Sequence, residues 1–142
     1  LAGAAALAAP LSKQAALKIM YERHEGMEAV GNANKLLRRQ VTADAPDIAA
    51  IRKSTATMAN LAARSGRWFP NGTGPEAGKT GAKPEIWQKP QDFAAKVRAF
   101  QAASKVLHQA ATRGDLAAVK ASYGKLGGTC KACHDPYRSE MH

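Results

Sequence analysis

The chain has 142 residues and a formal net charge of +10, and hydrophobic residues make up 45% of it while aromatic residues make up 6%. This length predicts one domain with a single core, and the abundance of alanine favours helices because alanine has the highest helix propensity. No apolar stretch reaches the roughly 20 residues that cross a bilayer, so membrane insertion is not expected. The basic residues are not interleaved with aromatic side chains, which argues against nucleic acid and leaves an acidic protein partner open.

The first ten residues, LAGAAALAAP, are small and apolar and contain repeated Ala-x-Ala. They resemble the end of a secretory signal, which predicts an exported, periplasmic protein. We therefore expect residues 1–11 to form a signal-like or weakly structured segment and residues 12–142 to form the domain. An alanine-rich extension of the first helix is the alternative.

Hydrophobic periodicity predicts four long helices and no strands. The first helix is expected to begin after Ser12, a suitable N-cap, and to end near Gln40. Asp44 is expected to cap the second helix, with Pro46 in its first turn. The glycine- and proline-rich residues 66–84 then predict a long connection without regular structure.

The third helix is expected to begin at Glu85 or Pro90 and to end at Arg113, with EIWQK as a short preceding turn if Pro90 lies in its first turn. Gly114 ends this helix and Asp115 caps the fourth. Apolar inner faces on all four helices, with no strand-like alternation anywhere, predict an all-α fold, an antiparallel four-helix bundle.

The expected inward face of the first helix contains one charged residue, Arg23, together with Met20 and Met27. The same helix contains Gly26 and Gly31, although each glycine costs about 1 kcal/mol relative to alanine in a helix interior. This cost predicts that a neighbouring element approaches the helix closely at the glycines.

The fourth helix ends in Cys-Lys-Ala-Cys-His, which contains both cysteines of the chain. Cys130 and Cys133 lie one helical turn apart, so their sulfurs can form thioethers with the two vinyl groups of one haem. His134, at i+4 from Cys130, lies on the same face and can coordinate the iron. We also expect small residues near the motif to let the flat macrocycle lie close to the helix: Gly127, Gly128 and Ala132.

Other uses of two thiols fit this sequence less well. Zinc needs about four protein ligands, and neither His24, His108 nor His142 has a paired ligand spacing that completes the set. A thioredoxin-like redox pair needs a βαβ context, and a disulfide within one helical turn constrains little. Haem c, one per chain and covalently bound, is therefore the expected cofactor; a non-haem metal-binding or structural helical protein is the alternative from another class.

Several segments around the motif resemble the class II cytochromes c, which include cytochrome c′ and its low-spin relative cytochrome c556. WFPNGT (residues 68–73) resembles the family's Phe-Pro-x-Gly-Thr after the second helix, and AKPEIW (residues 82–87) resembles the start of its third helix. ATRGDLAAVKASYGKLGGTCKACHDPYR resembles its fourth helix almost throughout. The resemblance covers residues 12–138 and implies a four-helix bundle with covalent haem near the C-terminal helix.

The resemblance also implies roles for individual residues. Phe69 and Trp87 match aromatic residues that pack around the haem, and Arg138 matches an arginine close to the proximal histidine. Pro136 departs from the family pattern; it removes the hydrogen bond to the carbonyl of Ala132 and is expected to loosen or end the helix. Family members often dimerise through their first two helices, so a homodimer is a further expectation.

In the family, the residue that faces the far side of the iron comes from the first helix. An apolar residue there, commonly Leu, leaves an open position that binds a gas, whereas Met makes an electron carrier. Met20 and Met27 lie on one face, and alignment through Lys-x-Met and Gly31 places Met20 in the ligand position, with Met27 as the second choice.

The family also has an arginine four residues before this position, where the present chain has Ala16. Neutralisation of one haem propionate is therefore expected to fall to another basic residue: Arg23, Lys18 or Lys13.

These features together predict one-electron transfer through low-spin haem, with His134 and Met20 as axial ligands and redox proteins, acidic ones among them, as partners. No substrate turnover is expected. The alternative is a five-coordinate, high-spin protein of the cytochrome c′ type that binds NO or CO, in which Met20 only shields the iron.

Overall fold

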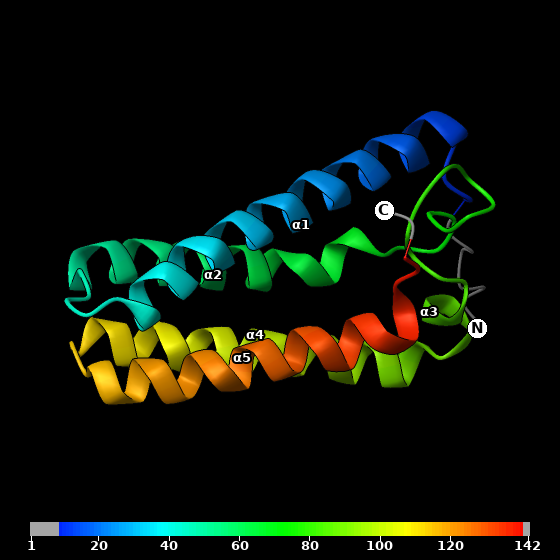
Figure 1. Ribbon diagram of the computed structural model, residues 1–142. Helices are drawn as coiled ribbons and strands as arrows, with labels where there is room; N and C mark the ends of the chain where they lie inside the picture. The colour runs from blue at the N-terminus through cyan, green and yellow to red at the C-terminus, as the bar shows by residue number, and fades with distance from the viewer. Residues whose placement is uncertain (1–8, 141–142) are drawn as a thin grey trace, which may run out of the picture.

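The computed structural model describes residues 9–140, and four long helices dominate it (Figure 1). Consecutive long helices run in opposite directions, which confirms the antiparallel four-helix bundle. The described residues contain no strand; one isolated bridge joins Ala82 and Arg138. The elements in chain order are α1 (Lys13–Thr42), α2 (Ile48–Ser65), the 3-10 turn η1 (Gly66–Trp68), α3 (Glu85–Gln88), α4 (Pro90–Thr112) and α5 (Leu116–Tyr137).

The first and last helices begin where the sequence predicts. The amide of Ala15 donates to Ser12 Oγ at 3.1 Å, and the amide of Ala118 donates to Asp115 Oδ1 at 3.0 Å. Pro90 lies in the first turn of α4, and α3 is the short turn expected before it. Residues 1–8 of the predicted N-terminal segment lie outside the described residues.

The predicted start of the second helix is wrong by three residues. Asp47, and not Asp44, is the N-cap of α2, and its Oδ1 accepts hydrogen bonds from the amides of Ala49 and Ala50 at 3.0 and 3.2 Å. Pro46 explains the difference, because a residue that precedes proline is disfavoured in the helical region and a helix capped at Asp44 would need Ala45 there.

The inner face of α1 carries the buried side chains that its periodicity predicts, including Met20 and the charged Arg23. α1 lies along α2 over its C-terminal part, whereas its N-terminal part diverges from the bundle and stands apart from α5 (Figure 1). The main core joins side chains of α1, α2, α4 and α5, with Leu37, Ile51 and Leu107 fully buried.

Close approach to α1 occurs at one of its two glycines. A Cβ atom at Gly26 would lie 2.4 Å from Cη2 of Trp68, so the indole of η1 packs directly on the helix backbone. Gly31 has nothing within 4 Å of the corresponding position, and the prediction of close approach is wrong there.

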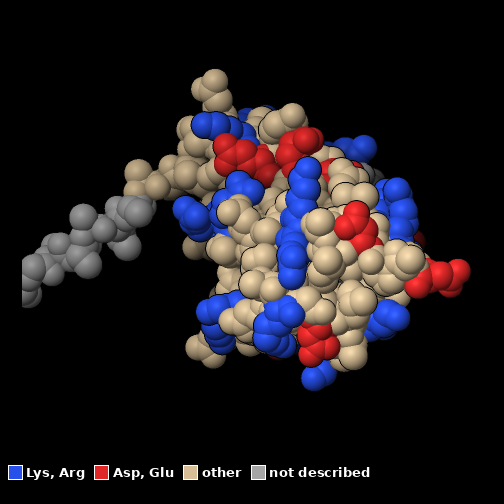
Figure 2. Space-filling view, turned by 90° about the vertical axis from the view of Figure 1, so that its left-hand side faces the viewer, with Lys and Arg blue, Asp and Glu red and all other residues tan. Residues whose placement is uncertain are grey.

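Two surface properties bear on possible partners. None of the helices formed by residues 9–140 is long and apolar enough to span a membrane. On the end of the molecule that Figure 2 shows, basic side chains are interspersed with acidic and uncharged ones.

Replacement of Gly26 by alanine tests the contact between α1 and Trp68. We expect Gly26→Ala to lower the free energy of unfolding by about 2 kcal/mol, because the indole must move to admit a methyl group. Gly124→Ala is the matched control, since Gly124 is an exposed glycine of α5 with nothing within 4 Å; it should raise stability by about 0.5–1 kcal/mol. Urea denaturation of the haem-bound variants measures both changes in the free energy of unfolding. Equal changes would contradict the close packing of Trp68 on α1 at Gly26.

Candidate functional site

A cavity of about 940 Å³ lies between α1 and the C-terminal part of α5. Cys130, Cys133 and His134 line it from α5, and Met20 and Met27 line it from α1. Its volume is within the range of roughly 300–1,000 Å³ that is usual for small-molecule and cofactor sites. The two thiols and the imidazole of the Cys-x-x-Cys-His motif therefore face a space of a size that suits a cofactor.

Cys130 and Cys133 are half-buried and form no disulfide. Burial raises the pKa of the Cys130 thiol, and it raises the pKa of Cys133 to about 11, so both thiols are protonated at neutral pH. Residues 9–140 contain no group of three or more His, Cys, Asp or Glu placed to bind a metal ion. His108 instead contacts Thr55 Oγ1 through Nδ1 at 2.9 Å, between α4 and α2.

The residues around the cavity fit haem. Two thiols and an imidazole supply the groups that attach a haem and ligate its iron. The remaining walls are largely apolar, as the faces of a macrocycle require. Apolar side chains that line the cavity include Leu17, Met20, Met27, Val30, Met58, Phe69, Ile86 and Phe93.

The wall that α1 forms contains a residue that the sequence analysis did not select. Leu17 lies one turn before Met20 and lines the cavity, although its side chain is 42% exposed. A Cβ atom at Gly78 would lie 2.9 Å from Leu17 Cδ2 and 3.6 Å from Met20 Cε, so the connection after η1 closes over both side chains. The sequence does point to Leu17, because residues three apart in a helix lie on the same face and Leu17 is three residues before Met20.

The two aromatic residues implied by the resemblance have different positions. Phe69 lines the cavity, and its ring packs edge-to-face against Phe93, with centroids 4.8 Å apart. Trp87 is not among the residues that line the cavity. Its Nε1 donates to the carbonyl oxygens of Phe69 and Pro70, both at 3.1 Å, so Trp87 holds the backbone that carries Phe69.

Arg23 fixes the connection between α2 and α3 to α1. Its Nη1 donates to the carbonyl of Trp68 and to Thr73 Oγ1 at 3.1 and 3.0 Å, and its Nη2 donates to the carbonyl of Thr73 and to Thr80 Oγ1 at 2.7 and 3.1 Å. The guanidinium also lies 5.1 Å from the centre of the Phe69 ring. Burial lowers the pKa of Arg23 to about 10, so it remains charged at neutral pH.

This arrangement bears on neutralisation of the haem propionates. The hydrogen bonds of Arg23 go to protein acceptors, and neither Lys13 nor Lys18 lines the cavity. Arg23 itself lines the cavity, and so do three further cationic residues: Lys35 of α1, Lys79 and Arg138.

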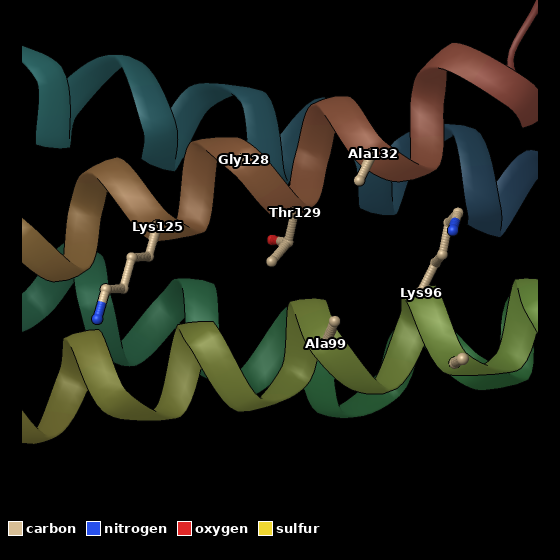
Figure 3. Close-up of a pocket in the computed structure, with 7 residues that line it drawn as sticks. Lys96, Ala99, Lys125, Gly128, Thr129 and Ala132 are labelled. Carbon is tan, nitrogen blue, oxygen red and sulfur yellow. The ribbon is translucent and has the colours of Figure 1, made fainter.

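Two of the three small residues near the motif, Gly128 and Ala132, face a different space from the thiols. Gly127, Gly128 and Ala132 are absent from the lining of the cavity. Gly128 and Ala132 instead line a separate groove of about 370 Å³ between α4 and α5, together with Thr129 and Ala99 (Figure 3). Successive residues of a helix point in different directions, and these face away from the side that carries the thiols.

The C-terminal end of α5 completes the cavity. The helix passes through Pro136 and ends at Tyr137, one residue after the proline that was expected to loosen or end it. Tyr137 lines the cavity with a buried ring, and its hydroxyl donates to Asp92. This hydrogen bond raises the pKa of Tyr137 to about 12 and lowers that of Asp92. Arg138 is exposed and also lines the cavity.

Removal of the Arg23 guanidinium should release the connection that it holds. Arg23→Met keeps a long side chain but leaves the buried carbonyl of Thr73 without its donor, and we expect the free energy of unfolding to fall by about 3 kcal/mol. Arg38→Met makes the same change at an exposed position of the same helix and should cost less than about 0.5 kcal/mol. Denaturation of the two haem-bound variants compares their free energies of unfolding. A loss for Arg23→Met as small as that for Arg38→Met would show that the hydrogen bonds of Arg23 contribute little to stability.

Comparison with known proteins gives consistent matches. Residues 18–138 match the family model of cytochrome c′. The cytochrome c′ of Pararhodospirillum photometricum is 36% identical over 116 residues, which cover 82% of this chain and 92% of that protein. The cytochrome c′ structure from Thermochromatium tepidum has a TM-score of 0.81 at 27% identity and covers 93% of this chain and 100% of its own.

Two further solved structures are informative about ligands and assembly. One is a nitric oxide complex of a variant cytochrome c′ from Alcaligenes xylosoxidans, with a TM-score of 0.79, 32% identity and coverage of 91% of this chain and 98% of that chain. The other is a cytochrome c′ with ligand-controlled dimer dissociation, with a TM-score of 0.80, 27% identity and coverage of 93% and 100%.

These matches correct the predicted function. Low-spin electron transfer with His134 and Met20 as axial ligands is wrong, because most of the relatives, and the structural neighbours, are cytochromes c′, nitric oxide complexes among them. The relationship to cytochrome c556 is likewise not supported. The matches favour the alternative of an iron that is open to a diatomic gas.

Proposed function

Because the chain belongs to the cytochrome c′ family and binds covalently attached haem c, we propose that it is a five-coordinate, high-spin haem protein that binds NO or CO. The observation that carries the proposal is the cavity, in which the thiols and imidazole of α5 face the side of α1 that carries the apolar side chains of Leu17 and Met20. Haem iron supplies an open coordination position for a diatomic ligand.

The residues of α5 hold the cofactor. Cys130 and Cys133 form the two thioethers and fix the haem to the helix, and His134 is the proximal ligand. Phe69 packs against the macrocycle, with its backbone held by Trp87. The rim contributes positive charge from Lys35, Lys79 and Arg138 to balance the haem carboxylates.

Leu17 and Met20 shield the distal face. Their terminal carbon atoms both lie beside Gly78, so the thioether methyl of Met20 packs against the connection between α2 and α3. An apolar wall of this kind excludes water while it admits a small neutral gas. Met20 thus acts as a hydrophobic side chain and not as a ligand.

The sequence and the relatives also support the remaining parts of the proposal. The protein is exported to the periplasm, as its signal-like first ten residues indicate, and it acts by binding rather than by turnover of a substrate. It forms a homodimer in which α1 and α2 make the contact, as the resemblance implies; a structural neighbour also dimerises. Any redox partner would approach a protein of formal net charge +10 and would gain from an acidic surface.

Absorption spectra of the oxidised and reduced protein test the central proposal. We expect broad high-spin bands and ready CO binding to the ferrous form, because no side chain fills the sixth position. Sharp split α and β bands in the reduced protein without added ligand would overturn it, as would the absence of a Soret band.

His134→Gly should lose the proximal ligand while thioether attachment persists, and added imidazole should restore the wild-type spectrum.

Substitutions on α1 test the distal wall. Leu17→Ala should speed CO association about tenfold, which corresponds to about 1.4 kcal/mol in barrier height. Leu36→Ala, which shortens an exposed leucine of the same helix outside the cavity, should have no effect. Met20→Leu keeps an apolar side chain without sulfur, so the spectrum should remain high-spin; a spectral change restricted to this variant would contradict the shielding role.

A further inference from the structure

The last turn of α5 is weakened at Pro136, two residues after the proximal histidine. Pro136 has no amide hydrogen, so the carbonyl of Ala132 receives no helical hydrogen bond from it. The amide of Arg138 donates to the carbonyl of His134 at 2.9 Å and closes the helix. The backbone that carries His134 is therefore held less firmly by its own helix than a regular turn would be.

Contacts with the connection that precedes α3 compensate for part of this loss. The amide of Lys83 donates to the carbonyl of Tyr137 at 2.9 Å, and the amide of Ser139 donates to the carbonyl of Gly81 at 2.8 Å. These bonds flank the bridge between Ala82 and Arg138. They fix the chain just after α5 but leave the direction of the last turn to side-chain contacts.

Tyr137 provides the side-chain contact. Its ring is 3% exposed and packs edge-to-face on Phe93, with centroids 5.2 Å apart, and its hydroxyl donates to Asp92 Oδ2. Asp92 is in the first turn of α4, where a carboxylate is favoured by the helix dipole, and its Oδ1 accepts from Lys96 Nζ at 3.3 Å. The end of α5 is thus bonded to the first turn of a neighbouring helix.

We propose that Tyr137 and Asp92 are positioning residues for His134: their hydrogen bond sets the orientation of the last turn of α5 and through it the iron–histidine bond. The inference rests on the proposed role of His134 as proximal ligand. Tyr137 lies three residues, or about one turn, after His134, so a displacement of its side chain tilts the turn that carries the imidazole. Groups outside the first coordination shell commonly orient and tune a ligating histidine in this way.

Tyr137→Phe removes the hydroxyl and keeps the ring against Phe93, so it isolates the hydrogen bond. We expect the iron–histidine stretching band of the ferrous protein, measured by resonance Raman spectroscopy, to shift and broaden, and CO affinity to change about tenfold. Asp92→Ala should reproduce both effects. Asp92→Asn retains an acceptor for the hydroxyl and should therefore keep a Raman band and a CO affinity close to those of the wild type.

The matched control is Tyr123→Phe. Tyr123 is also in α5, and its hydroxyl donates to Asn34 Oδ1 at 2.8 Å, three turns before the histidine. This control should lose comparable stability and keep the wild-type Raman band. If Tyr137→Phe also keeps that band and the wild-type CO affinity, the hydrogen bond is only structural and the proposal is overturned.

The comparison separates this inference from the proposed function. A wild-type protein with a six-coordinate iron would overturn gas binding at an open position, while shifts of haem spectra in Tyr137→Phe relative to Tyr123→Phe would still support positioning of His134. A five-coordinate wild type with no shift in Tyr137→Phe would overturn the positioning role alone. If Tyr137→Phe does not fold, Asp92→Ala and Asp92→Asn carry the same test.

Discussion

The arrangement of the bundle around the cavity depends on the hydrogen bonds that the buried guanidinium of Arg23 donates. A charge removed from water must be matched by polar partners, and here Trp68, Thr73 and Thr80 provide them. Those partners lie in the connection between α2 and α3, which has little regular structure. Without them, few interactions would hold this connection in one conformation. The positive φ of 87° at Gly72 turns the chain just before Thr73 and brings it to Arg23. A single polar residue in an apolar stripe thus orders most of the connection between α2 and α3.

The same connection forms parts of both walls of the cavity. Gly78 lies beside the ends of Leu17 and Met20 on the side of α1. Gly81 and Lys83 bond to the chain at the end of α5, next to the motif. The long irregular segment is therefore a structural element of the site.

Local sequence features predicted the helices and the cofactor, because caps, periodicity and the Cys-x-x-Cys-His spacing act within a few residues. Features that depend on distant partners were not predictable in this way. Arg23 was read as a polar interruption or a propionate partner, since its acceptor Trp68 is 45 residues away in the sequence. The cap of α2 lies at Asp47 and not at Asp44 because Pro46 disfavours the helical conformation at Ala45. Gly128 and Ala132 were assigned to the wrong side of α5.

The functional prediction failed for a related reason. The proximal side of a c-type haem is encoded within five consecutive residues, so a motif is enough to recognise it. The distal side is formed by whichever residue of α1 the packing presents, and Leu17 and Met20 are one turn apart on the same face. Periodicity cannot choose between them. Both side chains end beside Gly78, so the connection between α2 and α3 covers this part of the wall. The shape of the distal side therefore depends on tertiary contacts that α1 makes with a segment some sixty residues later in the chain.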